Sequence, residues 1–174
     1  GYEDPDKEER IKERKELFEK IIKGEFDIDR YEDFELIRDG RFGDTAWLSY
    51  KEKFTVKKLV SRAGRNYILE VGKLIGDQIK LDSGEMKTRV TDIWVPHART
   101  LENVISLNIP KDYTVEGVEE LNLSVDNESG AFISTAKVEE DRLVITTRKL
   151  YKKSFDKKEA WPNYIAFLVT AYKF

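Results

Sequence analysis

The sequence contains no cysteine among its 174 residues, and this absence excludes several kinds of chemistry. Disulfides, thiolate nucleophiles and cysteine-ligated zinc or iron–sulfur sites all require a side chain that the chain does not have. A cysteine-free chain suits either an oxidising or a reducing compartment, so composition does not identify where the protein resides. No apolar run approaches the roughly 20 residues that a membrane-spanning helix needs. We therefore expect no thiol chemistry and no membrane span.

Histidine is also scarce, because His97 is the only one in the chain. It lies in "DIWVPHARTLENVISLNIP", residues 92–110, just after Trp94 and Pro96. A general base needs an orienting partner, and a metal site needs three or four ligands, which a lone histidine does not supply. Pro96 is expected to end a strand, which makes His97 and Arg99 exposed turn residues. Trp94, His97 and Arg99 are the only cluster that we nominate for ligand binding.

Motifs for nucleophilic catalysis and phosphate binding are missing as well. The sequence has no Gly-x-Ser-x-Gly and no glycine-rich loop followed by Gly-Lys-Ser/Thr. "DNESG" at 126–130 offers oxygen ligands, but it lacks the length and the closing glutamate of a calcium loop. We therefore expect no catalytic residues, no metal and no cofactor, and we predict that this chain is not an enzyme.

Charged residues, in contrast, are abundant. They make up 37% of the chain, above the ordinary share of about 25%, while 40% hydrophobic residues still allow a core. The formal net charge of -3 gives no overall field that would attract nucleic acid or an anionic membrane. Because the chain begins with Gly1 rather than methionine, we expect it to be a piece of a longer protein.

Residues 6–24 have the pattern of an amphipathic helix that ends at Gly24. We interpret residues 1–32 as a helical linker or appendage that lies on the rest of the protein. A coiled-coil or partner-binding helix remains the alternative. The narrow apolar stripe consists of Ile11, Leu17, Phe18, Ile21 and Ile22.

From about residue 33 the hydrophobic period changes to two, which is typical of β-strands. The segment 66–75 carries apolar residues in both phases, as a strand buried on two faces would. Seven or eight strands without intervening helices predict a mainly β fold for residues 33–174. We expect an antiparallel β-sandwich, jelly-roll-like, with an N-terminal helix and a C-terminal helix. The predicted strands are 46–56, 66–75, 88–95, 102–109, 119–127, 130–138 and 141–151, with turns at 38–44, 61–65, 81–85, 126–130 and 139–141.

The last segment, 156–174, reverts to helical spacing, and Pro162 fits near a helix start. A final β-strand is the competing prediction, because apolar residues also alternate there. The shared helical face would consist of Trp161, Ile165, Leu168 and Ala171 or Tyr172.

The basic segment "RKLYKKSFDKK", 148–158, has Tyr151 and Phe155 between its cations and could bind phosphate or a polyanion. We favour a charged edge or face that prevents strand-to-strand aggregation. Strand alternation sends Lys149 and Tyr151 to one side. Asn122-Leu-Ser and Asn127-Glu-Ser match glycosylation acceptors, which matter only in a secreted eukaryotic protein.

Several short motifs together resemble the C-terminal region of bacterial transglutaminase-like proteins. The resemblance covers about residues 33–174, and the first helix would be the linker from the preceding domain. The matching features are Arg89 and Asp92 before Pro96, the step Ile109, Pro110, Tyr113, Val115, the hairpin residues Asn127 and Gly130, and the pair Lys149 and Tyr151, followed by an amphipathic C-terminal segment.

The resemblance implies a three-part extracytoplasmic protein with a β-sandwich, a papain-like transglutaminase core and a C-terminal β-domain. The catalytic Cys, His and Asp belong to the core, so it implies a non-catalytic accessory domain whose partner is that core. An apolar face buried against the core is then expected, with Trp47, Trp94 or Trp161 as members. The alternative is a carbohydrate- or peptide-binding module that uses Trp94, His97 and Arg99.

Overall fold

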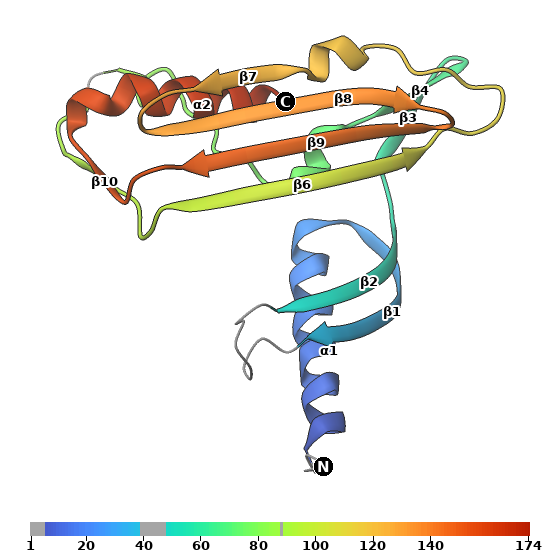
Figure 1. The fold of residues 1–174 in the computed structure, drawn as a ribbon. Coiled ribbons are helices and arrows are strands. Elements are labelled where there is room, and N and C mark those ends of the chain that lie inside the picture. The colour runs from blue at the N-terminus through green and yellow to red at the C-terminus, as the bar shows by residue number, and fades with distance from the viewer. Residues whose placement is uncertain (1–5, 39–47, 88) are drawn as a thin grey trace. The chain divides into compact units, whose positions relative to one another are not determined.

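A computed structural model describes residues 6–38, 48–87 and 89–174 (Figure 1). The chain divides into two compact units, Gly1–Glu70 and Val71–Phe174. The boundary that the sequence predicts after residue 32 falls inside the first strand, β1 (Ile28–Arg38). This strand pairs with the next one, so the segments on both sides of that boundary share one hairpin.

The N-terminal unit contains helix α1 (Lys7–Glu25) and an antiparallel hairpin of β1 and β2 (Ser49–Val56). Helix α1 confirms the helix predicted for 6–24. The helix and the hairpin meet at Phe18, whose ring centroid lies 4.1 Å from that of Tyr50 and 5.8 Å from that of Phe34. Among the described residues of this unit, Phe18 is the only buried apolar side chain. The predicted turn at 38–44 lies mostly outside the described residues.

A second, small hairpin consists of β3 (Val60–Ala63) and β4 (Asn66–Leu69). Gly64 supplies the positive φ of its turn, which confirms the turn predicted at 61–65. The prediction of one doubly buried strand over 66–75 is wrong. Strand β4 pairs only with β3 and is mostly exposed, and the chain then forms a 3-10 helix, η1 (Val71–Ile75). Gly76, also at positive φ, follows that turn.

The C-terminal unit is built on a four-stranded antiparallel sheet with the order β6-β9-β8-β7. The two hairpin turns confirm the turns predicted at 126–130 and 139–141. The predicted strand 119–127 begins instead with a 3-10 turn, η2 (Val118–Leu121). The strands are β6 (Arg99–Asn108), β7 (Leu123–Asp126), β8 (Gly130–Glu139) and β9 (Arg142–Tyr151).

Strands β5 (Ile93–Trp94) and β10 (Phe155–Asp156) pair as a two-stranded ribbon. In the sequence, β5 comes just before the four-stranded sheet begins and β10 just after it ends. The predicted strand 88–95 is therefore reduced to two paired residues. Pro96 follows the ribbon at the point where the sequence predicts the strand to end, since proline has no N–H to donate.

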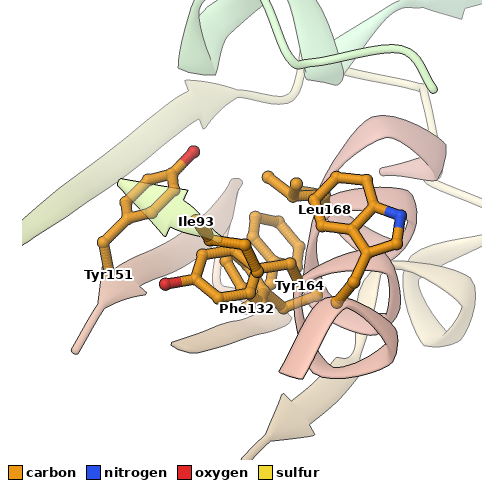
Figure 2. Packing of buried hydrophobic residues seen from close by; sticks show 8 residues of the cluster. Ile93, Phe132, Tyr151, Tyr164 and Leu168 are labelled. Carbon is orange, nitrogen blue, oxygen red and sulfur yellow. The ribbon is translucent and has the colours of Figure 1, made fainter. Parts of the chain in front are cut away.

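The chain ends in η3 (Lys158–Ala160) and helix α2 (Trp161–Lys173), with Pro162 in its first turn. This confirms the helical prediction over the competing strand. Helix α2 packs against β7 and β8, and its buried side chains form the main core with Ile93, Phe132 and Tyr151 (Figure 2). The helical contributors are Trp161, Tyr164, Phe167, Leu168 and Ala171.

The mainly β antiparallel fold with a helix at each end is confirmed. The sandwich arrangement stays a prediction with which these sheets are compatible. Among the described residues, no helix is both long and apolar enough to cross a membrane.

Strand β9 fixes which side chains face the core. Leu143, Ile145, Thr147, Lys149 and Tyr151 alternate onto the buried face, as the sequence predicts for the last two. For the part of the basic segment in β9, the edge alternative is wrong, because β9 lies between β6 and β8. The charged-face alternative stays a prediction.

Candidate ligand-binding surface

Of the three nominated residues, Trp94 offers a large aromatic side chain that is mostly exposed. In β5, Ile93 is 4% exposed and faces the core, so the next side chain, Trp94, points outward and is 72% exposed. The backbone N–H of Val95 donates to Ser154 O at 2.8 Å and extends the ribbon. The backbone of Trp94 is therefore held in the ribbon, while its side chain stays open to solvent.

Phe155 is the residue that the sequence analysis missed at this surface. It pairs directly with Trp94 across the β5–β10 ribbon, and its side chain is 50% exposed. Directly paired residues project to the same side of an antiparallel ribbon. The only signal for Phe155 in the sequence was its place in the basic segment 148–158. In the structure, Lys157 Nζ lies 5.2 Å from the centroid of the Phe155 ring.

His97 is exposed in the turn between β5 and β6, as the sequence predicts. In residues 6–38, 48–87 and 89–174, no hydrogen bond or ion pair involves this side chain, and no group of three or more His, Asp or Glu side chains is arranged to hold a metal ion. Nothing within these ranges links His97 to Trp94 or to Arg99.

Arg99 is the first residue of β6 rather than a turn residue, and it lies opposite Tyr151 in the register. Its guanidinium carbon is 5.0 Å from the centroid of the Tyr151 ring. A cation over an aromatic face is attracted by the quadrupole of the ring. Burial raises the pKa of Tyr151, and the charge of Arg99 partly opposes that shift.

Lys149 is a second residue that the sequence did not suggest as part of a binding surface. Only 7% of it is exposed, and its ammonium donates to Gln78 Oε1 at 2.9 Å and lies 5.5 Å from the Tyr151 ring centroid. Burial, with a smaller contribution from the charge of Arg99, lowers the pKa of Lys149 to about 8. Strand alternation placed Lys149 beside Tyr151 but could not show that Gln78 would cover it.

Trp161 is buried, so the expectation that it belongs to an exposed apolar face is wrong. Its indole N–H donates to Glu85 O at 2.8 Å, and the guanidinium of Arg89 lies 4.8 Å from its ring. Arg89, Glu85 and Trp161 are among the residues that line a surface hollow of about 440 Å³. Trp47 lies outside the described residues.

Two of the residues that carry the family resemblance, Asp92 and Gly130, make structural contacts in this unit. Asp92 accepts hydrogen bonds from Lys157 Nζ at 3.0 Å and from the backbone N–H of Lys158 at 3.1 Å. A Cβ at Gly130 would lie 2.5 Å from the Phe167 ring and 2.6 Å from Leu150 O, so only glycine fits there. The hydrogen bonds of Asp92 join the two segments that flank the β5–β10 ribbon. Gly130 lets the start of β8 lie close to β9 and to helix α2.

Both candidate glycosylation asparagines are occupied by hydrogen bonds. The side-chain oxygen of Asn127 accepts from the backbone N–H groups of Ser129 and Gly130, and its amide donates to Asn163 O at 2.9 Å. The side-chain oxygen of Asn122 accepts from the N–H of Ala136 at 2.8 Å. Attachment of a glycan would compete with these contacts.

The described residues thus form a mainly β unit with an exposed aromatic pair, Trp94 and Phe155, and with two cations, Arg99 and Lys149, at the ring of Tyr151. Comparison of the chain with protein-family models, with curated proteins and with solved structures gives no match.

Proposed function

We propose that the chain is a non-catalytic accessory interaction domain from the C-terminus of an extracytoplasmic transglutaminase-like protein. The family part of this proposal rests on the resemblance of residues 33–174. The observation that carries the interaction part is the exposed pair of Trp94 and Phe155.

An exposed aromatic pair on a short ribbon is well suited to a protein contact. Aromatic side chains are enriched at protein interfaces, and burial of apolar area contributes about 25 cal/mol per Å². Because the β5–β10 backbone already fixes both residues, binding would order few side chains. The preceding core of the same polypeptide is the proposed partner.

The first experiment is to determine the coding sequence upstream of Gly1. The proposal expects a papain-like domain with catalytic Cys, His and Asp positions ahead of the chain. A different domain at that place would contradict the family assignment.

The second experiment tests the surface in the protein that contains both domains. Hydrogen exchange of residues 93–95 and 154–156 should be slower in the longer protein than in this chain alone. The double substitution W94A/F155A should remove that difference, whereas the control V104A, at an exposed position of β6, should retain it. Equal exchange in both proteins would contradict the interaction.

Binding of a carbohydrate or peptide is the second candidate, because the Trp94 ring is 72% exposed and aromatic platforms stack on sugars. A glycan-array and thermal-shift screen of this chain, with W94A as the comparison, tests it. A screen in which no ligand distinguishes wild type from W94A would contradict this second function and leave the first one standing.

A further inference from the structure

Arg99 and Lys149 are two cations that approach the same aromatic ring from neighbouring strands. In the register of β6 with β9, Arg99 lies opposite Tyr151 and Leu101 lies opposite Lys149, so all four side chains project to the same face of the sheet. Both cationic groups lie within 5.5 Å of the centroid of the Tyr151 ring. Figure 2 shows Tyr151 at one side of the other labelled core side chains.

From this geometry we infer that Arg99, Lys149 and Tyr151 form a binding site for a small oxyanion, a carboxylate or a phosphate. The inference is independent of the proposed accessory function and of any contact with a transglutaminase-like core.

The charge balance of the site supports an anion. Within the described ranges, no carboxylate lies within ion-pair distance of Arg99 or Lys149. The one hydrogen bond found there for the ammonium goes to the neutral amide of Gln78, which is itself held by donating to Ile75 O and Gly76 O. A buried charge without a counter-charge is unfavourable, and a bound oxyanion would compensate it.

Cations on the opposite face of the same sheet are arranged differently. Arg148, next to Lys149 in β9, contacts Glu102 at 2.9 Å, and Lys137 contacts Glu139 at 2.6 Å. The buried-face pair thus differs from its neighbours in having no carboxylate partner among residues 6–38, 48–87 and 89–174. Arg148 is therefore a matched control for Arg99.

Access and chemistry both fit an oxyanion. Strand β6 is at the edge of the sheet and Arg99 is exposed, so a ligand can reach the guanidinium from solvent. A guanidinium binds two oxygens of a carboxylate or phosphate with matched geometry, whereas an ammonium acts as a compact point charge. Lys149, on the buried face of β9, would supply that second charge. The hydroxyl of Tyr151 can donate a hydrogen bond to an oxygen of the anion.

The test uses inorganic phosphate and acetate as probes, each compared with chloride at equal ionic strength, on the full 174-residue chain. We expect a probe at ten times its Kd to raise the melting temperature by about 3–6 °C in wild type and in Arg148→Gln. The rise should be absent in Arg99→Gln and in Lys149→Met. The general stabilisation by phosphate through exclusion from the surface would affect all four proteins equally.

A second readout keeps the inference testable if Lys149→Met does not fold. The NMR titration of the Lys149 ε-methylene should shift to higher pH when phosphate or acetate binds, and Arg99→Gln, which changes an exposed side chain, should abolish the shift. A melting-temperature rise that is the same in all variants, or a Lys149 titration that neither probe moves, would overturn the site.

Discussion

The two units of the chain are built from the same kinds of element but differ in how much apolar surface they bury. In the described part of Gly1–Glu70, Phe18 is the only buried apolar side chain, and the aromatic contacts with Phe34 and Tyr50 surround it. Every other buried apolar side chain that the structure describes belongs to Val71–Phe174, where helix α2 packs on β7 and β8.

The difference shows that a sequence can form regular helices and strands without burying a large apolar core. The N-terminal hairpin is lined with exposed ion pairs, such as Lys57 with Asp29 at 2.9 Å and Lys58 with Asp27 at 3.1 Å. Such pairs contribute little to stability because water screens them. We therefore expect the N-terminal unit to unfold before the C-terminal unit.

The largest expected effect is in the C-terminal core. Phe167 is fully buried against Tyr151 and Tyr164, so Phe167→Ala should lower the free energy of unfolding of that unit by about 3–5 kcal/mol. Urea denaturation followed by Trp fluorescence measures it. The control V104A changes a residue that is 74% exposed and should differ little from wild type.

Phe18→Ala should act on the other unit alone. Removal of this ring takes away the contact that joins α1 to the β1–β2 hairpin and should destabilise the N-terminal unit by about 3 kcal/mol. Amides of residues 7–25 should then exchange fast, while those of 130–151 keep their protection. Leu17→Ala, at a neighbouring position that is 49% exposed, is the control. Loss of protection in both units would contradict the comparison.

Lys149 introduces a pH dependence that only the C-terminal unit should have. Its pKa falls from 10.5 to about 8 on folding, so between these values the unfolded state binds more protons and stability rises with pH. The free energy of unfolding should rise by up to about 3 kcal/mol over this pH range. Because Lys149→Met has no charge to bury, the variant should show part of this gain already at pH 7. Urea midpoints at pH 7, 8 and 9 in wild type and variant measure it, and parallel curves would refute the assignment.

The smallest expected effect is at Asp92. The Lys157 ammonium and then the backbone N–H of Lys158 hold the pKa of this exposed carboxyl below its usual range. Its contribution is therefore present above the unfolded pKa and is lost as pH falls through the lower folded pKa. Asp92→Asn should flatten the acid limb of the stability curve slightly, as urea midpoints measured at acidic pH in wild type and variant would show.

Much of the fold could be predicted because the signals are local. The 3.6-residue period predicted α1 and the C-terminal helix, and the alternation with its turn residues predicted β8 and β9. The prediction of one buried strand over 66–75 was wrong, because a short apolar run has no period that distinguishes a buried strand from an exposed hairpin strand followed by a 3-10 turn.

Of the candidate site, the sequence identified the exposure of Trp94 and His97 but assigned Arg99 to a turn. It could not pair Phe155 with Trp94, because 60 residues that fold into a separate sheet lie between them. It also could not show that Lys149 is buried, since Gln78 reaches it from a segment 71 positions earlier in the chain.

The sequence by itself thus determined the two helices, the strands β8 and β9 with their turns, the shared face of Lys149 and Tyr151, and the chemistry that a chain without cysteine and with one histidine excludes. Only the tertiary structure decided which strands pair, that β9 is central, and that two cations meet at Tyr151. The physical reason is that side-chain periodicity depends on the backbone within a few residues, whereas register and burial depend on contacts between distant segments.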